Sequence, residues 1–318
     1  MTHVARPLRG IALIAAAAAT ATPALATDYP ERTVEIIHQY GPGGGTDRFI
    51  RAISEPMQNA TGESFVPISI TGGGGVPAFV TFMQRPANGY TLVSLSPDDV
   101  INHALGRIDL SNVQPLVRIQ YDQGLLLVSR DSEIRSVDDL LAAETAEPGG
   151  LKVGVTGSAG FDDALIGLFN QQAGIELATV PFGAAEMVSN TLGGHLDMMY
   201  EEYGPTRGLI ESGDLVPIVL FSDERLAELP DVPTAAELGY DVTLGRWRGF
   251  GIRPDTDRAQ IDTLVSLFKD AAADEGYKKV EADSALQYRS EFMGPDEFET
   301  FLDAEIETYS TIMNQLGY

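Results

Sequence analysis

A glycine-rich segment near the N-terminus has the residue types of an anion-binding loop. Residues 43–48 read Gly-Gly-Gly-Thr-Asp-Arg and follow a strand-like run at residues 34–40. Apolar residues then recur at helical spacing from Phe49 to Met57. A strand, a glycine loop and a helix start in this order leave several backbone N–H groups unpaired, and the helix dipole adds positive potential there. The segment therefore predicts a site for a small anionic ligand that needs no cationic side chain.

A second segment repeats this arrangement in the middle of the chain. A strand-like run at residues 152–156 leads into the small residues 157–160, and a helical pattern starts near Asp162. Ligands of open α/β sheets bind beyond the carboxyl ends of the strands, where both loops lie. We therefore expect the two loops to face one another across a cleft between two α/β domains. Each loop taken alone is also consistent with a tight strand–helix turn.

The N-terminus predicts export. Arg6 and Arg9 precede an alanine-rich apolar run at residues 10–21, and Ala-Leu-Ala at 24–26 follows it. This is the pattern of a secretory signal peptide, with cleavage after Ala26. The apolar run is shorter than the ~20 residues that a membrane span needs. Because the chain has no cysteine, disulfides and lipid attachment through cysteine are excluded, and we expect a free periplasmic protein.

Composition limits the partners. The remaining residues carry 19 basic against 46 acidic side chains once the two signal-peptide arginines are removed, a net charge near −27. Nucleic acid and anionic membrane surfaces are therefore poor partners. The length favours two domains. We expect a monomer that binds its ligand at a locally favourable site, since the overall field of the protein repels anions.

Strand and helix patterns alternate along the chain, which predicts an α/β fold with parallel or mixed sheets covered by helices. The predicted strands are residues 34–38, 65–70, 91–95, 125–129, 152–156, 177–180, 198–200 and 216–221. The predicted helices are residues 47–60, 76–85, 137–141, 162–173, 185–192, 258–273 and 295–315. In the last of these, apolar residues from Phe298 to Leu316 recur every three to four positions, which indicates a helix packed on the core.

Six short motifs resemble those of a known family. They are Tyr-Pro-Glu-Arg at 29–32, Gly-Pro-Gly-Gly-Gly-Thr-Asp at 41–47, Ala-Asn-Gly-Tyr-Thr-Leu at 87–92, Gly-Gly-His-Leu-Asp at 193–197, Leu-Pro-Asp-Val-Pro-Thr-Ala-Ala-Glu-Leu-Gly at 229–239 and Trp-Arg-Gly-Phe at 247–250. In this order and spacing they resemble the periplasmic substrate-binding proteins of tripartite tricarboxylate transporters, the Bug (TctC-like) family. Each motif is weak alone, but together they cover nearly the whole exported chain.

The resemblance implies a two-domain type II periplasmic binding protein fold that closes on a small mono-, di- or tricarboxylate and presents it to membrane permease subunits. Residues 27–125 and 250–318 would form domain 1, and residues 126–249 would form domain 2. The chain would cross between them near residues 124–127 and 247–251, which we predict to be the hinge. No enzymatic activity is expected.

Ligand contacts are carried over from the family by position. The first loop contributes Gly43, Gly44, Gly45, Thr46 and Asp47, and a neighbouring loop at residues 72–75 contributes Gly73 and Gly74. Ser96 follows the third strand, the second-domain loop contributes Thr156, Ser158, Ala159, Gly160 and Phe161, and Glu201 stands where the family often has an acid.

Three departures from the family pattern leave the ligand open. Thr71 stands before the second glycine loop where the family commonly has a basic residue, the usual Tyr-Lys-Gly is missing at 181–184, and Phe161 replaces a small hydroxyl residue. Phe161 and Phe182 could form an apolar wall of the site or plain core. Asp162 and Asp163 suit a helix cap. Alternatively Asp162, Glu201 or Glu202 receives the positive charge of an amino acid or another zwitterion.

Other chemistries find little support. The histidines have no metal-ligand spacing, and the glycine loop lacks the lysine of a nucleotide-binding P-loop, so we expect neither a metal nor a cofactor. Glu201 and Glu202 are adjacent on a strand and should point to opposite faces, which argues against a catalytic pair. Asp98 and Asp99 read as solvated loop or helix-cap residues. An exported enzyme of organic acids and a sensor subunit for a membrane receptor kinase remain as rival functions.

Overall fold

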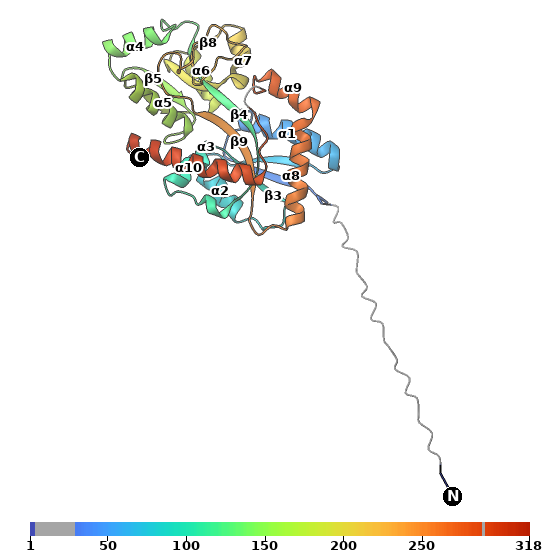
Figure 1. Cartoon of the computed structure of the whole chain (residues 1–318). Coiled ribbons are helices and arrows are strands. Elements are labelled where there is room, and N and C mark those ends of the chain that lie inside the picture. The colour runs from blue at the N-terminus through green and yellow to red at the C-terminus, as the bar shows by residue number, and fades with distance from the viewer. Residues whose placement is uncertain (4–28, 288–289) are drawn as a thin grey trace.

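The computed structural model describes residues 1–3, 29–287 and 290–318 (Figure 1). The predicted signal-peptide features at residues 4–26, including the cleavage site, lie outside the described residues. Within the described part of the chain, no helix is both long and apolar enough to cross a membrane.

The strands form one mixed sheet in the order β2-β1-β3-β9-β4-β7-β5-β6, and β8 pairs with β4. The strands are β1 (Val34–His38), β2 (Phe65–Ser69), β3 (Thr91–Leu95), β4 (Gln114–Ser129), β5 (Lys152–Val155), β6 (Ala178–Pro181), β7 (Met198–Glu202), β8 (Leu215–Leu220) and β9 (Gly245–Ile252). β1 is parallel to β2 and β3, and β5 is parallel to β6 and β7. β4 and β9 are antiparallel to one another and join these two parallel groups.

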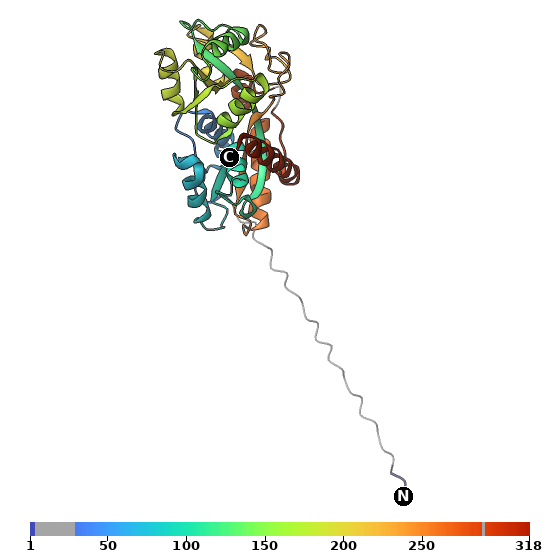
Figure 2. The ribbon, with the colours of Figure 1, turned by 90° about the vertical axis from the view of Figure 1, so that its left-hand side faces the viewer.

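The long strand β4 divides the sheet into two halves. From Gln114 to Gln123 it pairs with β9, and from Gly124 to Ser129 it pairs with β7 and β8. In Figures 1 and 2 the two halves lie one above the other, and Figure 1 shows β4 and β9 running between them. The carboxyl ends of the parallel strands of both halves therefore face the region between the halves.

Helices cover both halves. The α-helices are α1 (Gly45–Thr61), α2 (Val76–Met83), α3 (Pro97–Ala104), α4 (Val137–Ala146), α5 (Phe161–Ala173), α6 (Ala184–Leu192), α7 (Tyr203–Glu211), α8 (Arg258–Ala273), α9 (Glu275–Asp283) and α10 (Pro295–Leu316), with short 3-10 turns η1 (Gly73–Gly75) and η2 (Leu110–Asn112). α10 packs on α3, β4 and α5, and so spans both halves of the sheet (Figure 1).

Apolar periodicity explains the long helices. In α1, Phe49, Ile50, Ile53 and Met57 are buried as the spacing predicts, and the helix ends at Gly62, whose φ of 78° is readily adopted by glycine. The predicted core stripe of α10 is confirmed: Phe298, Leu302, Tyr309 and Met313 are buried, and the other predicted members are partly buried.

The sequence patterns did not predict several of the observed elements. β9 reads Gly-Arg-Trp-Arg-Gly-Phe-Gly-Ile, and all eight of its residues are buried. Its glycines and arginines are not typical of a buried strand, so the sequence pattern did not predict it. The first part of β4 and the helices α3, α7 and α9 were also missed. α3 opens with Pro97, Asp98 and Asp99, which the sequence assigned to a solvated loop or cap, yet both carboxyl side chains are buried. Only the cap assignment of Asp99 is right, since it shares a capping box with Ser96.

Candidate functional site

A cavity of about 650 Å³ lies between the two halves of the sheet. Its lining comes from residues that follow β1, β2, β5 and β6, from the end of β7, and from β9. Of these, the parallel strands β1, β2, β5, β6 and β7 all end at the cavity. The carboxyl ends of such strands are where α/β sheets bind their ligands. The residues are Gln39, Tyr40, Gly41, Pro42, Gly44, Gly45, Thr46, Thr71, Gly72, Thr156, Asp162, Pro181, Phe182, Gly183, Ala185, Glu186, Tyr200, Glu201, Glu202, Arg246 and Arg248.

The N-terminus of α1 presents free donors to this cavity. Gly44 has no side-chain cap, and the backbone N–H groups of Gly45 and Thr46 have no hydrogen-bond partner among the described residues. Gly45 cannot be replaced without movement, because a Cβ there would lie 2.4 Å from Nη2 of Arg248. Asp47 faces away from the cavity: its carboxylate accepts from the N–H of Gly43 (3.0 Å) and from Arg51 (2.9 Å).

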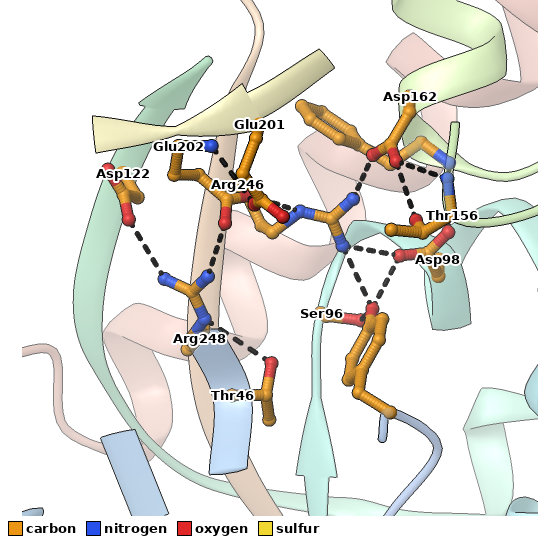
Figure 3. A network of polar contacts seen from close by, with 12 residues as sticks. Thr46, Ser96, Asp98, Asp122, Thr156, Asp162, Glu201, Glu202, Arg246 and Arg248 are labelled. Carbon is orange, nitrogen blue, oxygen red and sulfur yellow. Dashed lines mark hydrogen bonds and ion pairs between the residues drawn. The ribbon is translucent and has the colours of Figure 1, made fainter. Parts of the chain in front are cut away.

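Arg246 is the centre of a buried charge network (Figure 3). It donates to Asp98 at 2.7 Å and to Asp162, and its Nε lies 2.7 Å from the Glu202 carboxylate. Although burial alone would disfavour the charge, the carboxylates around it raise the pKa of Arg246 well above its usual range. The guanidinium group is therefore fully charged and already matched by the carboxylates of the protein.

Arg248 forms a second layer of the same network (Figure 3). Its guanidinium group lies 3.3 Å from Asp122 and 3.2 Å from Glu202, and its Nε donates to the hydroxyl of Thr46 at 3.3 Å. Burial opposes ionisation of Glu202, but the two arginines outweigh it and lower the pKa of Glu202. For Asp122, burial dominates and raises the pKa to about 7.

Asp98 occupies the N-terminus of the second-loop helix, α5. Its Oδ1 accepts from the N–H of Phe161 at 2.8 Å, and its Oδ2 accepts from the hydroxyl of Tyr40 at 2.5 Å. A Cβ on Gly160 would lie 2.8 Å from the same carboxylate. The anion position predicted at the second loop is thus filled, at this N–H group, by a carboxylate of the protein itself.

Asp162 and Asp163 do not cap α5, because Gly160 occupies the cap position. Asp162 accepts from the N–H of Thr156 at 2.8 Å and from its hydroxyl at 2.5 Å, and it also pairs with Arg246. Asp163 accepts from the N–H of Ala159 at 2.6 Å and from hydroxyl groups of other elements. Both carboxylates therefore hold the second loop in shape, and the helix-cap assignment is wrong.

Glu201 and Glu202 both line the cavity, contrary to the prediction that they point to opposite faces. The strand β7 ends at Glu202, which is also the residue before the first turn of α7, so strand geometry does not continue past it. The Glu201 carboxylate folds back to accept from the N–H of Glu202 at 3.0 Å. Burial and the Glu202 carboxylate raise the pKa of Glu201 well above its usual range.

The two phenylalanines have different roles. Phe161 is fully buried, packs edge-on against Tyr200 and Tyr309, and lies 4.7 Å below the Arg246 guanidinium group. Phe182 is only half-buried and lines the cavity. Phe161 is therefore core, and Phe182 supplies an apolar wall.

The remaining predicted site residues divide between two places. Gly73, Gly74, Ser158, Ala159 and Gly160 line a second cavity of about 340 Å³, which shares Gln39, Tyr40, Gly72 and Thr156 with the first. Gly43, Asp47, Ser96 and Phe161 line neither cavity. Ser96 instead contacts the hydroxyl of Tyr40 at 2.8 Å, behind the cavity wall.

Several residues of the site were missed from the sequence. Arg246 and Arg248 stand two positions apart in β9, the spacing that puts both side chains on one face of a strand. That spacing was the available signal, but it is visible only once the segment is known to be a strand. Asp122, Tyr40 and Tyr200 carried no local signal. Among the described residues, no group of three or more His, Cys, Asp or Glu is arranged to hold a metal ion.

Comparison with known proteins identifies the family. The tripartite tricarboxylate transporter family receptor, TctC, matches residues 49–317, which is most of the chain. The chain belongs to this family.

One curated relative and two solved structures are similar to this chain along nearly their whole length. The Protein BugT of Bordetella pertussis is 28% identical over 99% of this chain and 98% of its own. Among solved structures, Rpa4515 of R. palustris with adipate has a TM-score of 0.81 at 23% identity, covering 91% of this chain and 98% of its own. MatC from Rhodopseudomonas palustris with bound malate has a TM-score of 0.80 at 21% identity, and the match covers 89% of this chain and 99% of MatC.

These matches confirm the predicted family and the periplasmic-binding-protein fold. TctC proteins are solute-binding proteins and not enzymes, which removes the rival prediction of an exported enzyme.

Replacing Arg246 by methionine should be strongly destabilising. The substitution leaves Asp98 and Asp162 without their cation and leaves Glu202 with Arg248 alone, and breaking a buried ion pair on one side costs about 3–5 kcal/mol. Urea denaturation of the variant measures the loss. Arg258→Met is the control, because Arg258 pairs with Asp262 on the exposed surface of α8 and such pairs contribute about 0.3–0.5 kcal/mol. Equal stability of the two variants would contradict the network.

Stability should fall as pH rises from 5 to 8. Burial and the Asp98 carboxylate raise the pKa of Asp99 to about 7, whereas an unfolded aspartate ionises near pH ~4. Between these values the folded state holds more protons than the unfolded state, so raising the pH favours unfolding.

Asp99→Asn should make this dependence shallower, since asparagine can still accept from the N–H of Ser96 but cannot ionise, whereas Asp122, whose pKa burial also raises to about 7, still titrates. Thermal unfolding at pH 5, 6, 7 and 8 measures the slope. Asp138→Asn on the surface of α4 controls for the loss of one carboxyl group. A slope unchanged by Asp99→Asn would show that this group does not titrate as described.

Proposed function

We propose that the protein captures a small organic carboxylate in the 650 Å³ cavity and delivers it to a permease of the tripartite tricarboxylate type. The observation that carries the proposal is the uncapped N-terminus of α1, where the N–H groups of Gly45 and Thr46 have no hydrogen-bond partner among the described residues and where both residues line the cavity. Adipate and malate in the related structures support the carboxylate. The receptor family supports the permease partner.

We further propose that the two halves of the sheet are domains that close on the solute. Residues 27–125 and 250–318 would form one domain and residues 126–249 the other. The change of partner of β4 between Gln123 and Gly124 supports the first crossing, and the second crossing lies in β9. A hinge at these strands would bring Thr156 and Phe182 toward the α1 loop.

We propose that the protein acts in the periplasm. A signal peptide that is cleaved after Ala26 would direct its export. The receptor family supports this location. We propose a monomer as the working unit.

A thermal-shift screen against mono-, di- and tricarboxylates, aromatic acids and amino acids tests solute capture. At a hundred times its Kd, a ligand adds about 2.7 kcal/mol of stability, which for a chain of this size corresponds to a rise in Tm of several degrees. A rise with at least one carboxylate is expected. If no carboxylate raises Tm, the proposed function fails.

Gly44→Leu should weaken binding of the best carboxylate about tenfold or more, because the side chain fills the space in front of the free N–H groups. Gly44 has a φ of −69°, and a Cβ there only touches the carbonyl oxygen of Gly41 at 3.4 Å, so the fold should tolerate the change. Titration calorimetry measures Kd.

Gly208→Leu is the matched control, since a Cβ on this exposed residue of α7 meets nothing within 4 Å. Unchanged affinity in Gly44→Leu would show that the solute does not bind at α1. Delivery is tested by deleting the gene in the source organism: uptake of the solute should be lost, and should return with the parent protein and not with Gly44→Leu.

A further inference from the structure

The helix α10 joins the two halves of the sheet. It starts beside Met293, which pairs with Arg118 in the part of β4 that belongs to the half containing β1. Its other end packs on α5, in the half containing β5, and Figure 1 shows this end of α10 beside α5. The approach is close, because a Cβ built on Gly167 of α5 would lie 3.0 Å from a methyl carbon of Leu316.

The chain turns at the end of α10 so that Tyr318 reaches a buried acid. Gly317 has a φ of 82°, which glycine adopts readily, and the N–H of Tyr318 donates to the carbonyl oxygen of Met313 at 3.0 Å. The Tyr318 hydroxyl then donates to Asp163 of α5 at 2.7 Å. Burial and the Asp163 carboxylate raise the pKa of Tyr318 to about 12, so the hydroxyl keeps its proton at neutral pH. Although Tyr318 is 51% exposed, its polar end is bound to a residue that is only 6% exposed.

Asp163 in turn holds the second loop, residues 156–160. Its Oδ2, which accepts from Tyr318, also accepts from the N–H of Ala159 at 2.6 Å, and its Oδ1 accepts from the hydroxyl of Thr179 at 2.6 Å. Ala159 has a φ of 50°, a left-handed conformation that is unfavourable for a residue with a Cβ. Such a conformation persists only where the surrounding structure holds it. The hydrogen bond to Asp163 supplies that restraint.

The second loop forms part of the walls of both cavities. Thr156 lines the larger cavity, and residues 156–160 line the smaller one. A change in the conformation of Ala159 would move the residues on either side of it. The shape of the cavities therefore depends on a hydrogen-bonded chain that ends at Tyr318.

We propose that residues 316–318 form a strap, which reaches from one half of the sheet to the other and holds the second loop in the shape that binds the solute. Tyr318 is a positioning residue in this arrangement, since it acts through Asp163 and lines neither cavity. The inference rests on the proposed capture of a solute and adds the element that shapes the second side of its site. Because α10 starts in the half that carries α1, movement of the halves apart would loosen the strap and the second loop together.

Hydrogen exchange of residues 27–318 without ligand tests the strap. Tyr318→Phe removes one hydrogen bond and keeps the ring, so the protein should still fold. Loss of that bond should speed exchange of the Ala159 amide about three- to tenfold. Tyr240→Phe is the matched control and should leave this rate unchanged. The Tyr240 ring packs on Phe169 of the same helix, and its hydroxyl has no hydrogen bond among the described residues.

Gly167→Val tests the packing of the strap independently. The new side chain would meet Leu316, since a Cβ alone would already lie 3.0 Å from it, and should push the end of α10 away from α5. Exchange of the Ala159 amide should then rise as in Tyr318→Phe. Gly208→Val in α7 adds the same side chain where a Cβ meets nothing within 4 Å, and should leave the Ala159 rate at that of the parent.

Solute binding gives a second readout, measured by titration calorimetry. Tyr318→Phe should weaken binding of the best carboxylate about three- to tenfold, because binding must then also order the loop. Adding Ala159→Gly should return Kd to within about twofold of the parent, since glycine adopts a φ of 50° without strain. A tyrosine with only a packing role would not be rescued in this way.

The outcomes separate this inference from the proposed function. Exchange of the Ala159 amide that stays at the parent rate in either Tyr318→Phe or Gly167→Val would overturn the strap. Faster exchange with an unchanged Kd would overturn its role in solute binding, while capture of the solute would stand. If no carboxylate binds the parent protein, the proposed function fails, and the exchange rates still support or reject the strap.

Discussion

The need to neutralise a buried guanidinium group determines the form of the cleft. Arg246 lies on β9, and its carboxylate partners come from α3, α5 and β7. A buried charge is tolerated only when it is paired and hydrogen-bonded, so these elements must converge on one point. That point is the wall of the cavity. The same network pairs both arginines with carboxylates of the protein, so the proposed carboxylate ligand would bind backbone N–H groups of α1 rather than a cationic side chain.

The sequence predicted the elements whose pattern is local. The apolar spacing of α1 and α10 and the strand–glycine–helix junctions at residues 43–48 and 152–163 are visible without any partner, and they located both loops of the cleft. β9 was missed for the opposite reason. Its two arginines are tolerable in a buried strand only because distant carboxylates neutralise them, and no local pattern reports such partners.

The same limit explains the errors at individual acids. Asp98 and Asp99 look like surface residues beside a proline, but Asp98 pairs with an arginine 148 positions away. Asp162 and Asp163 look like helix caps, but Gly160 precedes the helix and both acids brace the loop. The motifs of the TctC family could identify the fold and the loops. They could not supply the charge balance of this cavity, which depends on the particular acids of this chain.

A crystal structure of the protein with its tightest-binding solute tests the central claim most directly. The account predicts solute density in the larger cavity, with carboxylate oxygens within hydrogen-bond distance of the N–H groups of Gly45 and Thr46, and with Arg246 still bound to Asp98, Asp162 and Glu202. Density confined to the second cavity, or a solute carboxylate that displaces these acids from Arg246, would contradict it.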